Sequence, residues 1–329
     1  MNQSPIQAPE ALPARNPIGE FDLSWVNHIK VNHAATLRRC ASLSARRSLK
    51  NQYQAAWLIK ALQCMDLTTL GGDDTPGRVE RLCLKALRPL RADLQAALGL
   101  NQPLRVGAVC VYHEMIAPAR QTLLQHGAGD LPIAAVSTAF PAGLASMETK
   151  VREIELSVAA GAAEIDIVIT RQHVLTGNWQ ALYDEMRAYR IACGDAHVKA
   201  ILATGDLQTL ENVAKASWVC MQAGADFIKT STGKEAHNAT LPVALTMVRC
   251  IRDYFDETGF QIGFKPAGGI SSAKSALQFL ILMQEELGRA WLEPTLFRLG
   301  ASSLLTDIER QLEHYVTGQY SANHRHAMP

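Results

Sequence analysis

The sequence predicts an α/β protein of the (β/α)8 type, a TIM barrel built as a single domain. Three observations support this fold: short β-type runs recur eight times, helix-type stretches separate them, and 329 residues suffice for one barrel. Alternating strands and helices favour a parallel sheet, and eight such units favour its closure. The predicted strands lie at residues 64–67, 105–111, 132–137, 164–169, 197–202, 226–229, 261–265 and 296–300.

Helices are predicted where apolar residues recur at helical spacing. Residues 51–63 show this pattern ahead of the first strand, and residues 209–223 and 241–255 show it between later strands. An open, doubly wound sheet is the competing architecture. That fold normally carries a Gly-x-Gly-x-x-Gly turn after its first strand, and neither this turn nor a Walker-type phosphate loop occurs in the sequence.

The pattern divides the chain into three parts. Residues 1–50 form an N-terminal arm, which we expect to be disordered over about the first 20 residues, because they are polar and rich in proline, and helical after that. Residues 51–316 form the (β/α)8 barrel, and residues 317–329 form a polar C-terminal tail.

Composition excludes several classes of partner. The 32 Lys and Arg residues nearly balance the 31 Asp and Glu residues, so no overall field attracts nucleic acid or an anionic membrane surface. The seven cysteines are odd in number and lie in apolar stretches, which is typical of reduced core thiols. No apolar leader or membrane-spanning stretch is visible, and we expect a cytoplasmic protein. A homo-oligomer is possible, and the sequence does not decide the oligomeric state.

Four consecutive predicted strands carry a charge at or near their C-terminal ends, namely Asp166, Lys199, Lys229 and Lys265. Strands of a parallel barrel are covered by helices outside and filled with side chains inside, so a charge within them needs a reason. Side chains alternate with a period of two, and apolar neighbours such as Ile165 take the helix side. All four charged side chains are therefore expected to face the barrel interior.

Lys229 and Lys265 should lie close together, because neighbouring strands are about 4.8 Å apart. Burial and like charge would both lower the pKa of one lysine, as attack on a carbonyl at neutral pH requires. Each charge alone could be a structural ion pair. Three lysines against one aspartate do not pair off, however, and barrel enzymes place their chemistry at the C-terminal ends of strands. We therefore favour catalysis by this group of charges over a set of structural ion pairs.

Glycines and serines follow the last two predicted strands, at residues 266–270 and 300–304. Glycine allows backbone N–H groups to face a ligand, and the loops after strands seven and eight are the recurrent phosphate site of this architecture. Separately, such residues are more usual as turns and helix caps. Together they predict a site for a phosphate monoester, formed by Gly268, Gly269, Gly300, Ser302 and Ser303.

Residues 230–234 follow Lys229 directly and add hydroxyl groups and a cation to the same rim. Thr232, Gly233 and Lys234 are therefore candidate ligands of the same anion. A capped helix start with a solvated lysine is the alternative for this segment.

Four segments resemble the deoxyribose-phosphate aldolase family. They are Asp-Phe-Ile-Lys-Thr-Ser-Thr-Gly-Lys at 226–234, Gly-Phe-Lys-Pro-Ala-Gly-Gly at 263–269, Met-Asp-Leu-Thr-Thr-Leu at 65–70 and Glu-Ile-Asp-Ile-Val at 164–168. The resemblance extends from about Gln52 to Tyr320, and the long N-terminal arm is similar to that of the animal-type members.

The resemblance implies a class I aldolase, a lyase that cleaves 2-deoxy-D-ribose 5-phosphate reversibly to D-glyceraldehyde 3-phosphate and acetaldehyde without metal or organic cofactor. It implies that Lys229 forms the Schiff base, that Lys265 lowers the pKa of Lys229, and that Asp166 relays protons with a water molecule. It also implies substrate-binding positions at Asp66, for a hydroxyl group, and at Lys199, and assigns the phosphate to the glycines, serines and Lys234 named above.

Two departures from the family pattern affect this reading. Ser271 stands where the family often has arginine, which would weaken phosphate affinity, and His113 replaces a proline after the second strand. Asp73 and Asp74 follow two glycines, and we read them as a turn without a chemical role. Two other functions stay open: a catalytically weak barrel retained as a binding or regulatory partner, and an imine-forming lyase or transaldolase for another sugar phosphate.

Overall fold

The computed structural model describes residues 15–46 and 48–326, and within them eight parallel strands form one sheet in the order β7-β6-β5-β4-β3-β2-β1-β8. Parallel bridges from Phe264 to Phe297 and from Ala267 to Gly300 bring β7 beside β8, so the sheet nearly closes. The predicted barrel is confirmed. The strands are β1 (Met65–Thr68), β2 (Ala108–Val111), β3 (Ile133–Ser137), β4 (Glu164–Val168), β5 (His197–Ile201), β6 (Phe227–Lys229), β7 (Gly263–Lys265) and β8 (Leu299–Ala301).

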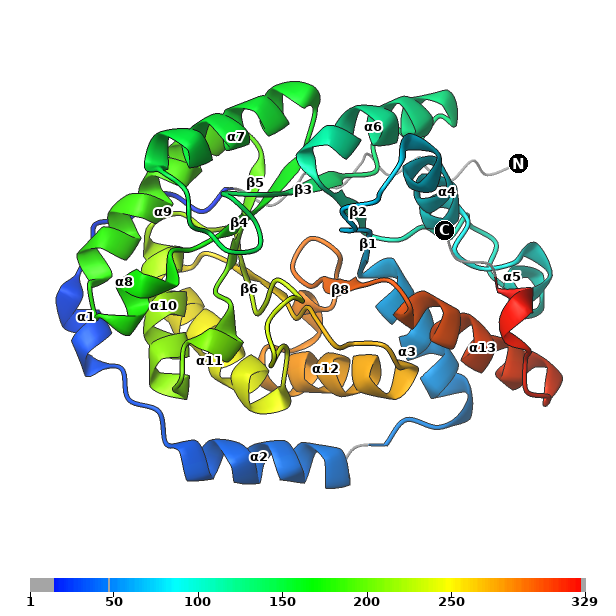
Figure 1. Cartoon of the computed structure of the whole chain (residues 1–329). Helices are drawn as coiled ribbons and strands as arrows, with labels where there is room; N and C mark the ends of the chain where they lie inside the picture. The colour runs from blue at the N-terminus through cyan, green and yellow to red at the C-terminus, as the bar shows by residue number, and fades with distance from the viewer. Residues whose placement is uncertain (1–14, 47, 327–329) are drawn as a thin grey trace, which may run out of the picture.

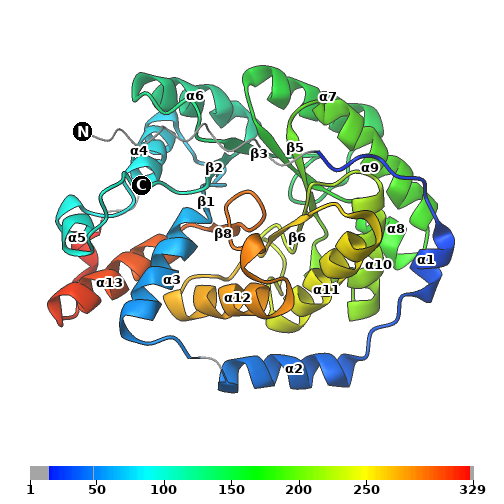
Figure 2. The same cartoon turned by 180° about the vertical axis from the view of Figure 1, so that it is seen from behind.

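Helices surround the barrel as an outer ring (Figures 1 and 2). The predicted helix at 51–63 forms with those bounds, whereas the predicted helix at 241–255 continues to residue 258. The helices are α1 (Leu23–His28), α2 (His33–Arg46), α3 (Asn51–Gln63), α4 (Pro76–Leu87), α5 (Ala92–Ala97), α6 (Ile116–Gln125), α7 (Met147–Ala160), α8 (Arg171–Leu175), α9 (Trp179–Cys193), α10 (Leu210–Gln222), α11 (Leu241–Thr258), α12 (Ala273–Glu286) and α13 (Leu304–Thr317), with 3₁₀ turns at His113–Met115, Thr204–Asp206, Arg289–Trp291 and Asn323–Arg325.

Hydroxyl side chains fix where several helices begin, at the end of the barrel where the strands finish. The Thr75 side chain accepts a hydrogen bond from the backbone N–H of Arg78, and Pro76 occupies the first turn of α4, where a missing N–H costs little. Thr209 and Thr240 cap α10 and α11 in the same way, as does Ser272 for α12. These caps hold the backbone in place where the loops at the rim of the barrel lead into the helices.

The predicted alternation along the strands is confirmed. Ile165 and Ile167 of β4 are fully buried in the large apolar core, whereas Asp166 between them makes its ionic contacts inside the barrel. A separate small apolar cluster of Cys110, Ala134 and Val136 comes from β2 and β3. The register pairs Val136 with Asp166, so this cluster is on the interior side of the sheet too. The barrel interior is thus apolar on one side and charged on the other.

The N-terminal arm is anchored over the part that the structure describes. The Asn16 side chain is buried and donates hydrogen bonds to the carbonyl oxygens of Met221 at 2.7 Å and Ala225 at 3.0 Å, and its N–H donates to Asp226 at 2.9 Å. The disorder predicted for about the first 20 residues is therefore wrong at Asn16, because its amide satisfies buried backbone carbonyls, while residues 1–14 lie outside the described ranges. The predicted helical part is present as α1 and α2, and α2 contacts α11 and α12 from outside (Figure 1).

All seven cysteines are free and buried, which confirms their prediction as reduced core thiols. In the tail, the buried His326 Nε2 lies 2.8 Å from the Glu313 carboxylate of α13, which ties this segment to the barrel. None of the helices in the described ranges combines the length and the apolar character that a bilayer crossing needs.

Candidate active site

Asp166 is the centre of a buried ionic cluster inside the barrel. Its Oδ2 accepts hydrogen bonds from Lys229 Nζ and Lys265 Nζ, both at 2.7 Å, and its Oδ1 accepts one from Lys199 Nζ at 3.0 Å. The strand register places Lys229 directly opposite Lys265. The four charges that the sequence placed inside the barrel are therefore brought together, and the two lysines share one carboxylate oxygen.

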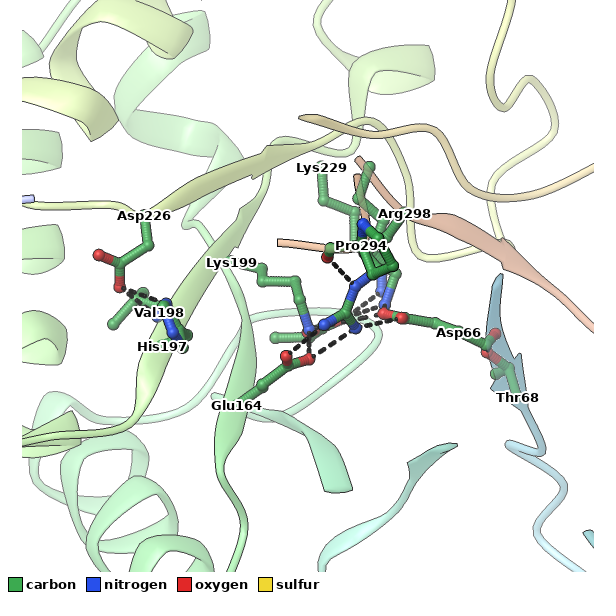
Figure 3. Close-up of polar contacts among 12 residues, drawn as sticks. Asp66, Thr68, Glu164, His197, Val198, Lys199, Asp226, Lys229, Pro294 and Arg298 are labelled. Carbon is green, nitrogen blue, oxygen red and sulfur yellow. Dashed lines mark hydrogen bonds and ion pairs between the residues drawn. The ribbon is translucent and has the colours of Figure 1, made fainter. Parts of the chain in front are cut away.

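The sequence prediction missed two further members of this cluster, Glu164 and Arg298. The Arg298 guanidinium contacts Asp66 Oδ1 at 2.5 Å and Glu164 Oε1 at 2.7 Å, and the Lys199 ammonium also pairs with Glu164 (Figure 3). Glu164 lies two residues before Asp166, so the alternation could have revealed it. Glu164 and Asp66 add negative charge, but with Arg298 the cluster holds four cationic side chains against three carboxylates, so the predicted excess of cations remains.

The surroundings of the two central lysines differ in one carboxylate. Burial and the neighbouring Lys265 lower the pKa of Lys229 more than Asp166 raises it. Burial also acts to lower the pKa of Lys265, but Asp166 and Asp66 together outweigh it and raise that pKa. Asp66 Oδ2 lies 2.5 Å from Lys265 Nζ. Of the two amines, Lys229 is therefore the one that loses its proton more readily.

Asp166 stays ionised in this cluster. Burial alone would raise the pKa of its carboxyl group, but Lys199, Lys229 and Lys265 together hold that pKa well below its usual value. Asp166 is thus a carboxylate in contact with Lys229, and an ionised carboxylate is the charge state that a proton acceptor needs.

Lys229 opens into a pocket of about 650 Å³ at the rim of the barrel. All eight residues that the sequence predicted for the phosphate group line the same pocket: Thr232, Gly233, Lys234, Gly268, Gly269, Gly300, Ser302 and Ser303. Four lining side chains are cationic types and none is a carboxylate. Such a pocket favours an anionic ligand.

Two glycines of the pocket are required by its geometry. Gly268 has φ of 82°, and a Cβ atom there would lie 2.6 Å from the Asn238 side chain. A Cβ atom at Gly300 would lie 2.8 Å from the Cβ atom of Ala267 and 3.2 Å from Cε of Lys265. The absence of a side chain at Gly300 therefore provides the space in which the Lys265 side chain extends to Asp166.

Asp66 and Lys199, which were predicted to bind substrate, do not line the pocket. Both are fully buried below it, and their contacts are ion pairs with Arg298, Lys265 and the two β4 carboxylates. The substrate-binding roles of Asp66 and Lys199 therefore stay predictions. Ser271 lies in the pocket wall, and His113 does not, since its Nδ1 is 3.0 Å from Ser157 Oγ at another face.

Two arginines in the pocket wall were also missed. Arg78 and Arg81 belong to α4, one and two turns into the helix that follows β1. The sequence holds a weak signal for them, because helices of a parallel barrel begin at the rim that carries the chemistry.

Replacing Arg298 by methionine is expected to lower the free energy of unfolding by about 3 kcal/mol, because Glu164 and Asp66 each lose their guanidinium partner in a buried site. Urea unfolding followed by circular dichroism measures the change. Arg105→Met is the matched control, since its pair with Asp130 is exposed and should contribute about 1 kcal/mol or less. Equal losses in the two variants would show that the buried pairs contribute no more to stability than the exposed pair.

A family model described as DeoC/LacD family aldolase matches residues 60–307. The chain is 56% identical over 312 residues to deoxyribose-phosphate aldolase of Homo sapiens, covering 94% of this chain and 98% of that protein. It is 57% identical over 306 residues to deoxyribose-phosphate aldolase of Mus musculus, covering 93% and 96%. The solved structure of deoxyribose phosphate aldolase from Aeropyrum pernix has a TM-score of 0.60 at 20% identity, covering 81% and 97%, and supports the fold alone. By these matches the chain belongs to the DeoC/LacD family of aldolases.

Proposed function

We propose that this chain is a class I aldolase that cleaves 2-deoxy-D-ribose 5-phosphate reversibly to D-glyceraldehyde 3-phosphate and acetaldehyde, in deoxyribose phosphate catabolism. The observation that carries the proposal is a buried Lys229 of lowered pKa that opens into a pocket lined by cations and glycines. The names of the human and mouse relatives supply the substrate. The barrel at 51–316 is the proposed catalytic unit.

The neutral Lys229 amine would attack the C1 aldehyde carbon of the open-chain sugar. The resulting carbinolamine loses water and leaves a protonated imine, which serves as an electron sink. When a base takes the proton of the C3 hydroxyl group, the C2–C3 bond breaks, and its electron pair moves toward the imine to form an enamine. Glyceraldehyde 3-phosphate departs, C2 takes up a proton, and water hydrolyses the imine to release acetaldehyde and Lys229.

Asp166 is the proposed proton relay, acting with a water molecule, because it is an ionised carboxylate in contact with Lys229 Nζ. Lys265 is the proposed permanent cation beside the nucleophile. We assign the phosphate group to the pocket loops and Lys234, whose Nζ already reaches the carbonyl oxygen of Leu70 at 3.4 Å across the pocket. The free thiols in the core favour a reducing compartment, for which we propose the cytoplasm.

The direct test is a product assay. Purified protein incubated with 2-deoxy-D-ribose 5-phosphate should release acetaldehyde and glyceraldehyde 3-phosphate in equal amounts, and it should run in reverse from those two aldehydes. Other sugar phosphates, such as fructose 6-phosphate, serve as controls for the transaldolase alternative. Faster cleavage of one of these, or no release of acetaldehyde, would refute the assignment.

A further inference from the structure

The pocket above Lys229 carries more positive charge than its loops account for. Besides Lys229 and Lys234, the wall contains Arg78 and Arg81 from α4. Residues 78, 81 and 82 all line the pocket, and their spacing of three and four places them on one face of the helix. One face of α4 therefore forms a wall of the pocket, although α4 is far in sequence from the glycine loops after β7 and β8 that form the rest.

The Arg81 side chain points back toward the first turn of α4. Side chains of a helix lean toward its N-terminus, and a Cβ atom placed on Gly77 would lie 3.9 Å from Arg81 Nη1. The first turn of α4 is the end nearest the strand that precedes it, at the catalytic rim. The guanidinium group is thus carried toward the pocket mouth rather than away along the helix.

The two arginines differ in their partners. Arg78 Nη1 lies 3.2 Å from both Asp73 Oδ1 and Asp74 Oδ1, and Asp74 is itself held by the hydroxyl group of Thr69 at 2.7 Å. Arg78 is therefore fixed and largely neutralised. The Arg81 side chain is exposed, and it makes no hydrogen bond or ion pair with any of the described residues. Its guanidinium group is available for an external anion.

We propose that Arg81 is a direct ligand of the substrate's phosphate group, with Arg78 and its two aspartates holding the adjoining loop in place. This inference rests on the proposed function. Arg81 brings a guanidinium group to the pocket from α4, whereas Ser271, in the loop after β7 that lines the same pocket, carries no charge. A planar guanidinium group matches two phosphate oxygens at once, which backbone N–H groups and Lys234 alone do not provide.

The test compares Arg81→Met with Arg88→Met, a matched control at the far end of α4 that is exposed and outside the pocket lining. We expect Arg81→Met to lower kcat/KM for 2-deoxy-D-ribose 5-phosphate by about 10- to 100-fold, mostly through KM, because a charge-assisted hydrogen bond is lost. Cleavage of unphosphorylated 2-deoxy-D-ribose should change less than about twofold, and Arg88→Met should leave both unchanged. An equal loss for both sugars would overturn the proposal.

A double variant moves the positive charge from α4 to the loop after β7 within the same pocket. The double variant Arg81→Met with Ser271→Arg should recover most of the lost kcat/KM for the phosphorylated sugar, because the two positions face one ligand. Calorimetry with inorganic phosphate gives a readout that needs no catalysis: Arg81→Met should weaken its Kd, and an unchanged Kd would overturn the inference. If the wild-type protein cleaves neither sugar while its phosphate affinity still depends on Arg81, the proposed function fails and the anion site stands.

Discussion

Replacement of Lys229 by methionine is expected to lower kcat for aldol cleavage by about 10³-fold or more, since no other amine opens from the cluster into the pocket. Lys199 and Lys265 are fully buried and bound to carboxylates, and their pKa values are raised, so neither can take over the attack. The variant should fold, because Asp166 keeps contacts with both remaining lysines.

Borohydride reduction in the presence of acetaldehyde, followed by peptide mass mapping, locates the imine. In the wild-type protein the two-carbon adduct should be on Lys229, and the methionine variant should contain no adduct inside the barrel. Lys215→Met is the control, because that lysine forms a part-buried pair with Glu211 on the outer helix α10 and should affect neither adduct nor rate. An adduct that appears on a different interior lysine during turnover would remove Lys229 from the role of nucleophile.

Replacement of Lys265 by leucine is expected to shift the pH profile of imine formation upward and to lower kcat at neutral pH by about 10²-fold. The amine must be neutral to attack. Burial and then the charge of Lys265 hold the pKa of Lys229 below its usual value, so removing that charge lets the pKa rise. A larger fraction of Lys229 is then protonated at neutral pH, and more alkaline solution is needed to reach the same rate.

The Lys265 variant leaves no interior carboxylate without a partner. Asp66 keeps Arg298 and Lys199, and Asp166 keeps Lys199 and Lys229, so a folded protein is expected and circular dichroism can verify it. The pH dependence of borohydride trapping measures the shift directly. Lys60→Met, which removes a surface lysine paired with Glu293, is the control. Superimposable profiles for wild type and Lys265→Leu would mean that Lys265 does not tune the nucleophile.

The interior position of the four charged strand residues could be predicted because it depends only on local geometry. Successive side chains of a strand alternate between its faces, and isoleucines at 165 and 167 assign the other face to the helices. The same reasoning could have found Glu164. The shared pocket of the two glycine loops was predictable for a related reason, since loops after the last two strands lie together at the rim of this architecture.

Other features depend on contacts between residues far apart in the chain. Which of the two opposed lysines has the lower pKa depends on Asp66 of β1, about 200 residues away from Lys265, and the two meet only because the barrel closes. Arg298, which precedes β8, contacts Asp66 only because the closed barrel brings β8 beside β1. Arg81 of α4 lies in the same pocket as the β7 and β8 loops for the same reason. The strand pattern by itself determined that charges point inward. Only the tertiary structure decided how those charges balance, because Coulombic interactions depend on distances in space, which the order of residues does not contain.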